Sequence, residues 1–281
     1  MGSLTDFAEN ELLDHLFNAA YTASANLYLV LCTGDPTDAA TGASCNEVAD
    51  ANGYERTAIT FGAASARRIT QNAQVQFPQA TGSWGTISHW CIADSATHGA
   101  GNILAHGAFS SSFTPVSGNT PSVASGQVYV EISATSGGAG FTTSCVNSLL
   151  DLAFRNQTYT SPAGNTFIAL LSVVADDDDA TVANLTEITG TGYARVEVNP
   201  DGGSSPTWDV ASGGVVDNGA AITFPEVGSG GWDQVVAAAI VSTASGAGNV
   251  IGYDNSNVVD QTPAAGDTVQ FAAGAFAITL T

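Results

Sequence analysis

The sequence contains no lysine, and its basic residues are five arginines, at positions 56, 67, 68, 155 and 195. Against them stand 26 aspartate and glutamate residues, which give a net charge of −21 at pH 7. Because proteins hold phosphate backbones through lysine and arginine, a surface this acidic excludes DNA and RNA as direct partners. The absence of lysine also excludes a Gly-Lys-Ser/Thr phosphate-binding loop.

Long apolar runs are missing as well. No stretch of about 18 apolar residues occurs, so we expect no transmembrane helix and no membrane partner. Residues 1–8 lack the basic and apolar regions of a secretory signal. The four cysteines, Cys32, Cys45, Cys91 and Cys145, are too few and too scattered for a disulfide framework. We expect free, small core residues, although Cys32 and Cys45 could lie close across a loop.

What the chain does contain is a repeat. Gly53-Tyr54-Glu55-Arg56 returns as Gly192-Tyr193-Ala194-Arg195, and Asn10-Glu11-Leu12-Leu13-Asp14 returns as Asn147-Ser148-Leu149-Leu150-Asp151. Further pairs follow in the same order: Phe77-Pro78 with Phe224-Pro225, Gly82-Ser83-Trp84 with Gly230-Gly231-Trp232, and Gly101-Asn102 with Gly248-Asn249. Matches that keep their order indicate the tandem duplication of a domain of about 140 residues.

Each copy is predicted to be a helix followed by short β-strands. Residues 4–20 show helical spacing of apolar residues after an N-cap at Thr5 or Asp6, and residues 144–154 repeat the pattern. Short apolar runs bounded by Gly, Pro and Asp then follow in both copies. With 31 glycines and only 11% charged residues, we predict a mainly β chain of two tandem helix-capped antiparallel β-sandwich domains.

The composition also suggests where the copies meet. We place the first β-sandwich repeat, with its N-terminal helix, at residues 1–135 and the second at residues 141–281. The Gly-rich run at residues 136–140 is predicted to be the linker. The two copies share no cysteine position, so no duplicated metal site is expected to use cysteine.

The recurring residues are candidates for structural roles. Each copy has a tyrosine, an arginine two residues later and a glutamate just upstream: Tyr54, Arg56 and Glu47 in the first, and Tyr193, Arg195 and Glu187 in the second. A guanidinium can bind a carboxylate through two parallel hydrogen bonds, so we expect each arginine to pair with the glutamate of its own copy. Such pairs would be structural buttresses.

Trp84 and Trp232 occupy equivalent turns of the two copies. One interpretation is a platform on which sugars stack. The other is a tryptophan packed into a corner of the fold, which we favour because tryptophan side chains are usually largely buried.

No pattern in the chain predicts catalysis. There is no Gly-x-Ser-x-Gly elbow, and no pair of histidines has the spacing of a helical metal site. The acidic run at residues 176–179 lacks the EF-hand spacing and indicates a solvated loop. We therefore predict no catalytic residue, no cofactor, no metal site and no enzyme activity.

Several motifs of the first copy occur together in one known family. They are Asn-Glu-Leu-Leu-Asp at 10–14, Leu-Tyr-Leu-Val-Leu-Cys at 27–32, Asn-Glu-Val at 46–48 and Gly-Tyr-Glu-Arg at 53–56. The chain resembles tailed-bacteriophage virion proteins that are commonly labelled phage tail fibre proteins, here as a tandem duplication. The resemblance covers residues 4–132 and, more weakly, 141–280. It implies a virion structural protein and brings no catalytic residues.

These observations predict a non-enzymatic structural protein on the exterior of a tailed-phage virion. We favour a capsid decoration (cement) protein that stabilises capsomers; the alternative is a tail fibre or tail-tip component that binds the host cell surface. A hydrolase would need a coupled acid–base pair that the spacing does not support. Expected partners are other virion proteins, either the major capsid protein or tail proteins, and further copies of the chain, with a trimer favoured. Assembly would take place in the bacterial host cytoplasm.

Overall fold

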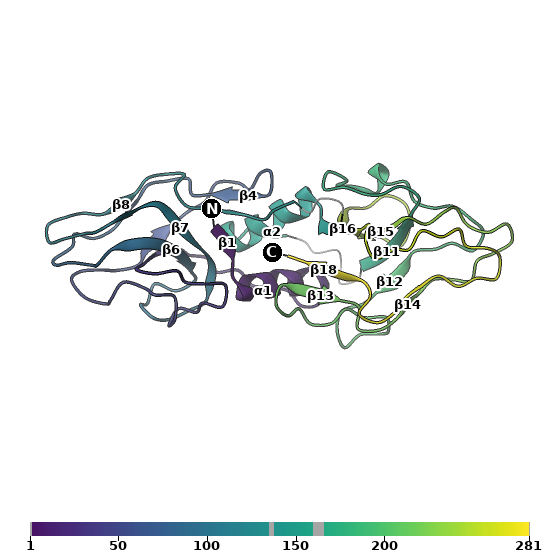
Figure 1. Ribbon diagram of the computed structural model, residues 1–281, viewed down its shortest axis with the longest axis horizontal. Coiled ribbons are helices and arrows are strands. Elements are labelled where there is room, and N and C mark those ends of the chain that lie inside the picture. Colours follow the sequence, from purple (N-terminus) through teal and green to yellow (C-terminus); the bar gives the residue numbers. More distant parts are fainter. Residues whose placement is uncertain (1, 135–137, 160–165, 281) are drawn as a thin grey trace.

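The computed structural model describes residues 2–134, 138–159 and 166–280. Figure 1 shows an elongated molecule with a β-rich lobe at each end and the two helices between them. Both chain ends lie near this central region (Figure 1). The predicted mainly β fold with two repeated domains is therefore confirmed.

The two helices form where the apolar spacing predicted them. Helix α1 is Asp6–Phe17, and the side chain of its N-cap Thr5 accepts a hydrogen bond from the backbone N–H of Ala8. Helix α2 is Thr143–Arg155, and its N-cap Thr142 makes the equivalent bond to Cys145. A capping hydroxyl satisfies one of the N–H groups that the first helical turn leaves without a partner. Of the described helices, neither is long and apolar enough to cross a membrane.

The first repeat is built on a seven-stranded sheet with the order β3-β2-β6-β7-β1-β9-β4 and a two-stranded ribbon of β5 and β8. Its strands are β1 (Gly2–Leu4), β2 (Leu27–Cys32), β3 (Thr57–Ile59), β4 (Arg68–Thr70), β5 (Val75–Gln76), β6 (Ile87–Ala93), β7 (Ile103–Phe113), β8 (Ser122–Val123) and β9 (Tyr129–Glu131). The predicted antiparallel pairing has one exception, since β1 and β9 are parallel.

Among the described residues, the second repeat has the same strand pairings except that β10 and β18, the equivalents of β1 and β9, are not paired. A five-stranded sheet has the order β10-β16-β15-β11-β12, and β13-β18 and β14-β17 form ribbons. The strands are β10 (Ala139–Phe141), β11 (Thr166–Leu171), β12 (Val196–Val198), β13 (Val215–Asp217), β14 (Ile222–Thr223), β15 (Ala237–Val241), β16 (Val250–Asp254), β17 (Gln270–Phe271) and β18 (Ala277–Thr279), and a 3-10 turn, η1, covers Val182–Asn184. The two halves thus share one topology.

The predicted linker differs from the structure at its C-terminal end. Ala139 and Gly140 belong to β10, which pairs with β16; residues 136 and 137 lie outside the described residues. A Cβ on Gly252 of β16 would lie 2.8 Å from the carbonyl oxygen of Gly140. The glycines therefore allow two backbones to approach closely, and this part of the Gly-rich run is a strand and not a flexible connector.

Each helix packs on both repeats. Helix α1 contacts β7 of its own repeat and β13 of the other, and α2 contacts β16 of its own repeat and β4 of the other. One continuous hydrophobic cluster contains Leu12 of α1, Leu149 of α2 and core residues of both lobes. The two repeats therefore share a single core across the central region.

Two polar side chains of α1 bind the backbone of the second repeat. The Oδ1 atom of Asn10 accepts a hydrogen bond from the N–H of Gly214 at 3.0 Å, and the Oδ1 atom of Asp14 accepts one from Ala211 at 2.9 Å. Both donors lie in the turn that precedes β13. N–H groups in a packed turn need acceptors, and here helix α1 of the first repeat supplies them to a turn of the second repeat.

Helix α2 makes the same bonds in the opposite direction. The Oδ1 atom of Asn147 accepts a hydrogen bond from the N–H of Arg67 at 2.9 Å, and the Oδ1 atom of Asp151 accepts one from Ala64 at 2.8 Å. These donors lie in the turn before β4, which is equivalent to the turn before β13. The junction therefore has approximate two-fold symmetry, and its asparagine and aspartate come from the repeated Asn-x-x-x-Asp pattern.

Aromatic contacts follow the same symmetry. Near the end of α1, Phe17 packs on Trp208 of the second repeat with ring centroids 4.7 Å apart. Near the end of α2, Phe154 packs on Phe61 of the first repeat with centroids 5.2 Å apart. Buried aromatic pairs of this kind add about 0.5–1.5 kcal/mol beyond the area they bury.

We expect Asn147→Ala to lower the free energy of unfolding by about 1–3 kcal/mol, because the N–H of Arg67 then loses its acceptor inside the junction. Urea unfolding followed by tryptophan fluorescence measures the loss. Ser148→Ala on the same helix removes only a bond to Ser144 within the helix and should change the stability by less than about 0.5 kcal/mol. Equal losses in the two variants would contradict a stabilising role of the junction bond.

Candidate functional site

The first repeat contains the predicted pair of Arg56 and Glu47 in a buried cluster, which Tyr54 joins. The Nε and Nη2 atoms of Arg56 donate to the two carboxylate oxygens of Glu47 at 2.8 and 2.7 Å, and the hydroxyl of Tyr54 donates to the same carboxylate at 3.1 Å. The remaining guanidinium nitrogen, Nη1, donates to the carbonyl oxygens of Ser95 and Ala100 at 2.9 and 2.8 Å. The pair therefore anchors the turn between β6 and β7 to the rest of the lobe.

The second repeat contains the same cluster. The Nε and Nη2 atoms of Arg195 donate to the carboxylate of Glu187 at 3.0 and 2.8 Å, and Tyr193 donates to it at 2.7 Å. Here Nη1 donates to the carbonyl oxygen of Thr243 at 2.8 Å. The glutamate side chain is 23% exposed, against 4% for its counterpart in the first repeat, so the second cluster is the more solvated one.

Burial and hydrogen bonding shift the pKa values of Tyr54, Tyr193, Arg56 and Arg195 upward. Burial, followed by the charge of Glu47, raises the pKa of Tyr54 above its usual range, and burial raises that of Tyr193. Burial alone would lower the pKa of Arg56, but hydrogen bonding to Glu47 raises it. A protonated phenol and a permanently charged guanidinium form a static clamp, which is the arrangement of a structural buttress and not of a proton-transfer site.

Both equivalent tryptophans are packed inside the corners of the lobes. Trp84 and Trp232 are each 4% exposed, and each indole N–H donates to a backbone carbonyl, at 2.9 and 3.0 Å. The rings contact Tyr54 and Tyr193 in T-shaped geometry with centroids 5.3 and 5.4 Å apart. Their faces are not available to a sugar, so the structure has the packed-corner arrangement.

The sequence patterns did not reveal one buried cation at the junction. Arg67 donates through Nε to the carbonyl oxygen of Ile132, through Nη2 to that of Ser133 and through Nη1 to that of Phe141, at 3.0, 2.9 and 2.8 Å. The guanidinium therefore joins the end of the first repeat to the first strand of the second. The residue equivalent to Arg67 in the second repeat is Gly214, so comparing the repeats does not single out Arg67. The only sequence feature that points to Arg67 is that the chain has few basic residues.

The predicted solvated acidic loop, residues 176–179, also reaches the junction. The Asp177 carboxylate accepts a hydrogen bond from the hydroxyl of Tyr253 at 2.5 Å and lies 3.8 Å from the guanidinium of Arg67. Within the loop, Asp176 and Asp179 accept bonds from backbone N–H groups of the same turn. These carboxylates are used as turn and junction acceptors.

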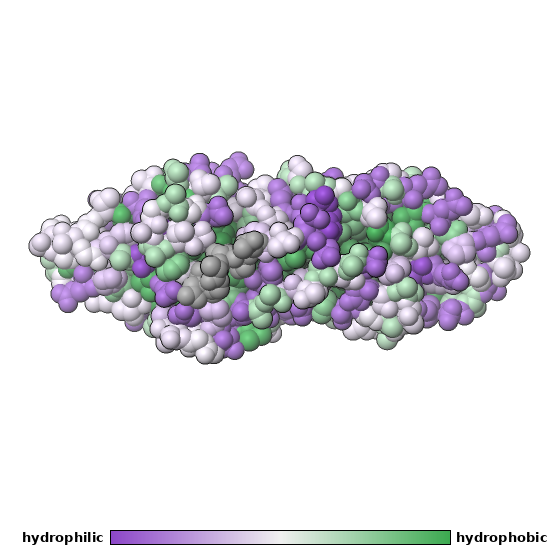
Figure 2. Space-filling model, turned by 180° about the vertical axis from the view of Figure 1, so that it is seen from behind, coloured by the Kyte–Doolittle hydropathy of each residue, from purple (hydrophilic) through white to green (hydrophobic). Residues whose placement is uncertain are grey.

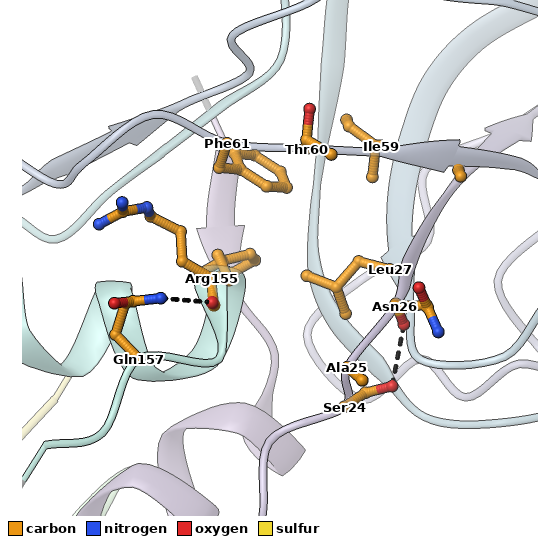
Figure 3. A pocket seen from close by; sticks show the side chains of 11 residues that line it. Ser24, Ala25, Asn26, Leu27, Ile59, Thr60, Phe61, Arg155 and Gln157 are labelled. Carbon is orange, nitrogen blue, oxygen red and sulfur yellow. Dashed lines mark hydrogen bonds between the residues drawn. The ribbon is translucent and has the colours of Figure 1, made fainter.

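A pocket of about 340 Å³ opens beside the end of α2 (Figure 3). Its walls come from the segment before β2, from β3 and the residues after it, and from the end of α2: Ser24, Ala25, Asn26, Leu27, Ala58, Ile59, Thr60, Phe61, Phe154, Arg155 and Gln157. The described residues of the lining include no carboxylate and no histidine, and the one cation among them, Arg155, is paired with Asp151 at 3.1 Å. It offers amide and hydroxyl groups to a ligand but no acid–base pair.

The pocket exists because the repeats differ in one loop. In the second repeat, an additional segment at residues 200–207 lies against the end of α1, where Asp201 donates its N–H to Asn18 at 2.9 Å. The first repeat passes directly from Thr60 to Phe61 at the equivalent place. Among the described residues, no equivalent of this segment covers the end of α2.

One acid has a pKa near neutrality. Burial, with the charges of Asp38 and Asp6, raises the pKa of Glu9 to about 7. A shifted acid can mark a catalytic site, but this one occupies the space beside Gly214, where a Cβ would lie 2.5 Å from its Oε2 atom. Glu9 thus packs against the backbone of the second repeat, and the glycine makes room for it.

The family model described as Podophage GP4 fiber I protein gp80 matches the chain twice, over residues 3–131 and 140–279. The chain belongs to this family. The predicted resemblance to phage fibre proteins is thereby confirmed, and the chain is a phage structural protein of the fibre type. No match was found among curated proteins.

The two matches coincide with the two lobes. The first ends with β9, and the second begins in β10 and ends with β18. One unit of this fibre family is therefore a complete lobe with its own helix, and this fibre-type chain contains two such units joined through their helices. The tyrosine, arginine and glutamate cluster occurs once in each unit.

The two units provide a matched test of the buttress. Glu47→Gln leaves the guanidinium of Arg56 buried and unpaired, so we expect a loss of about 3 kcal/mol in the free energy of unfolding. Glu187→Gln should cost less, because water reaches the more exposed pair. Urea unfolding of the two variants and the parent protein measures both values. A loss in the second unit that equals or exceeds that in the first would refute burial as the cause.

Proposed function

We propose that this chain is a non-enzymatic component of a fibre on the exterior of a tailed-phage virion. The observation that carries the proposal is the double match to a fibre family, which covers both lobes. The description of that family favours the fibre over the capsid decoration protein that the composition suggested. The fibre is therefore the better supported of the two virion locations.

The shape and surface of the molecule support an assembly role. The long axis runs from lobe to lobe through the shared helical junction (Figure 1). Figure 2 shows a face with hydrophilic and near-neutral residues over most of its area and small, scattered apolar regions. Among the residues that the structure describes, the exposed large apolar side chains are those of Val116, Val173, Val174, Val210 and Val259. Contacts with other virion proteins would then depend on polar groups and shape more than on one large apolar patch.

The locked side chains support a mechanical role over a catalytic one. In both units the recurring carboxylate is already bound by an arginine and a tyrosine. Among the described residues, the pocket beside α2 is lined by no carboxylate and no histidine. Since both corner tryptophans are buried, contact with a host surface would use other residues, at the outer loops of the lobes.

Labelling of virions locates the protein. We expect gold-labelled antibody against this chain to bind at the fibres in negatively stained particles. Particles incubated with antibody raised against an unrelated protein are the control. Label distributed over the head would refute the fibre location and support capsid decoration instead.

We further propose that the chain acts as a homo-oligomer, with a trimer favoured, together with other virion proteins, and that it assembles in the bacterial host cytoplasm. The strong negative charge keeps separate copies soluble but does not prevent specific polar contacts. Light scattering at micromolar concentration should give a mass above the 28.3 kDa of one chain. A monomeric mass under these conditions would contradict the proposed oligomer.

A further inference from the structure

Three of the four cysteines lie together inside the first lobe. The Sγ atoms of Cys32, Cys45 and Cys91 all lie within 4.8 Å of one another, and those of Cys32 and Cys91 are 3.6 Å apart. All three residues are buried and none is in a disulfide bond. Cys145, in α2, is not part of the cluster.

The fold brings them together from three distant segments. Cys32 ends β2 and Cys91 lies in the neighbouring strand β6, opposite Val30. Because side chains alternate along a strand, Cys32 and Cys91 point to the same face of the sheet. Cys45 comes from the loop that covers this face, just before Glu47, which bridges to Cys32. Two ligands on the sheet thus face a third on the loop.

The second lobe shows that the fold does not need thiols here. Strand register makes Leu171 equivalent to Cys32 and Ala239 equivalent to Cys91. Leu185 is equivalent to Cys45, because each lies two residues before the glutamate of its repeat. These residues belong to an ordinary apolar cluster. Three separate positions therefore carry cysteine in one lobe and hydrocarbon in its duplicate, and the three cysteines are the ones that meet in space.

We propose that Cys32, Cys45 and Cys91 form a three-sulfur site for a soft metal ion, with Cu⁺ as the best fit. A metal–sulfur bond of about 2.3 Å places the sulfur atoms of a trigonal site about 4.0 Å apart. The observed separations lie around this value, so an ion fits between the three sulfurs with small movements.

The number of ligands favours Cu⁺ over Zn²⁺. Within the described residues, the cluster has three ligand groups and no fourth one. The carboxylate of Glu47, two residues after Cys45, is already held by Arg56 and Tyr54. Structural Zn²⁺ is nearly always four-coordinate, whereas thiolates also select Cu⁺ among the soft ions.

Cysteine binds a metal ion as the thiolate. Metal binding therefore releases the thiol protons to water, and one bound ion takes their place among the three sulfur atoms. The ion would join β2, β6 and the covering loop, a cross-link that the second lobe does not have.

The test is copper loading of the full chain. Reduced protein is refolded without oxygen in the presence of Cu⁺ and a competing Cu⁺ chelator, desalted, and analysed for copper by mass spectrometry. We expect about one copper ion per chain and a higher melting temperature than for metal-free protein. Refolding with Zn²⁺ in parallel should give less bound metal.

The chain supplies its own variants for this experiment. Cys91→Ala reproduces the residue of the second lobe, and we expect it to lose most of the bound copper and the rise in melting temperature. Cys145→Ala removes a buried thiol outside the cluster and should bind copper as the parent does. Equal copper in Cys91→Ala and the parent, or equal losses in both variants, would overturn the proposal.

A second measurement does not depend on refolding. The protein is purified without reductant and denatured, and its thiols are then titrated. Four reactive thiols per chain are expected, because all four cysteines are free in the structure. A disulfide between two cysteines of the cluster would remove two of them and would also overturn the proposal.

Discussion

Each half of this protein completes the backbone hydrogen bonding of the other half. The helix of one repeat supplies an asparagine and an aspartate, one turn apart, to the N–H groups of a turn in the opposite repeat, and the second helix returns the same bonds. Without its neighbour, each lobe would have an uncovered helix face and an unsatisfied turn. This reciprocity explains why both helices lie at the centre and both lobes point outward (Figure 1).

The two repeats differ in the residues at their junction, in one loop and in the side chains that fill the lobe interiors. Arg67 binds two carbonyl oxygens at the end of its own repeat and one in the second repeat, whereas its equivalent, Gly214, leaves space for the buried carboxylate of Glu9. An additional loop covers the end of α1, and its absence in the first repeat opens a pocket beside α2. The cysteine cluster is a third difference, since hydrocarbon side chains fill the same place in the second lobe. Symmetric backbones thus carry asymmetric interiors.

Rigid lobes on a shared core are suited to a fibre-type virion protein. In each lobe a buried arginine holds a glutamate and the turn between two central strands, and a tryptophan packs on the tyrosine of the same cluster. These side chains are bound to one another inside each lobe. The mechanical unit is the pair of family domains joined through their helices, because neither turn at the junction is complete alone.

The sequence by itself determined the duplication, the two helices with their caps, the mainly β character and the family. These features depend on neighbouring residues, since periodicity and capping are read within a few positions and both copies repeat them. The pairing of Arg56 with Glu47 could be inferred because a glutamate followed by a tyrosine and an arginine recurs in the same order in the second copy. Only the tertiary structure decided that each helix serves the opposite repeat, that glycine-rich residues 139 and 140 form a strand, and that three scattered cysteines meet. Those outcomes depend on contacts between segments that are far apart in the sequence, and local residue patterns do not predict such contacts.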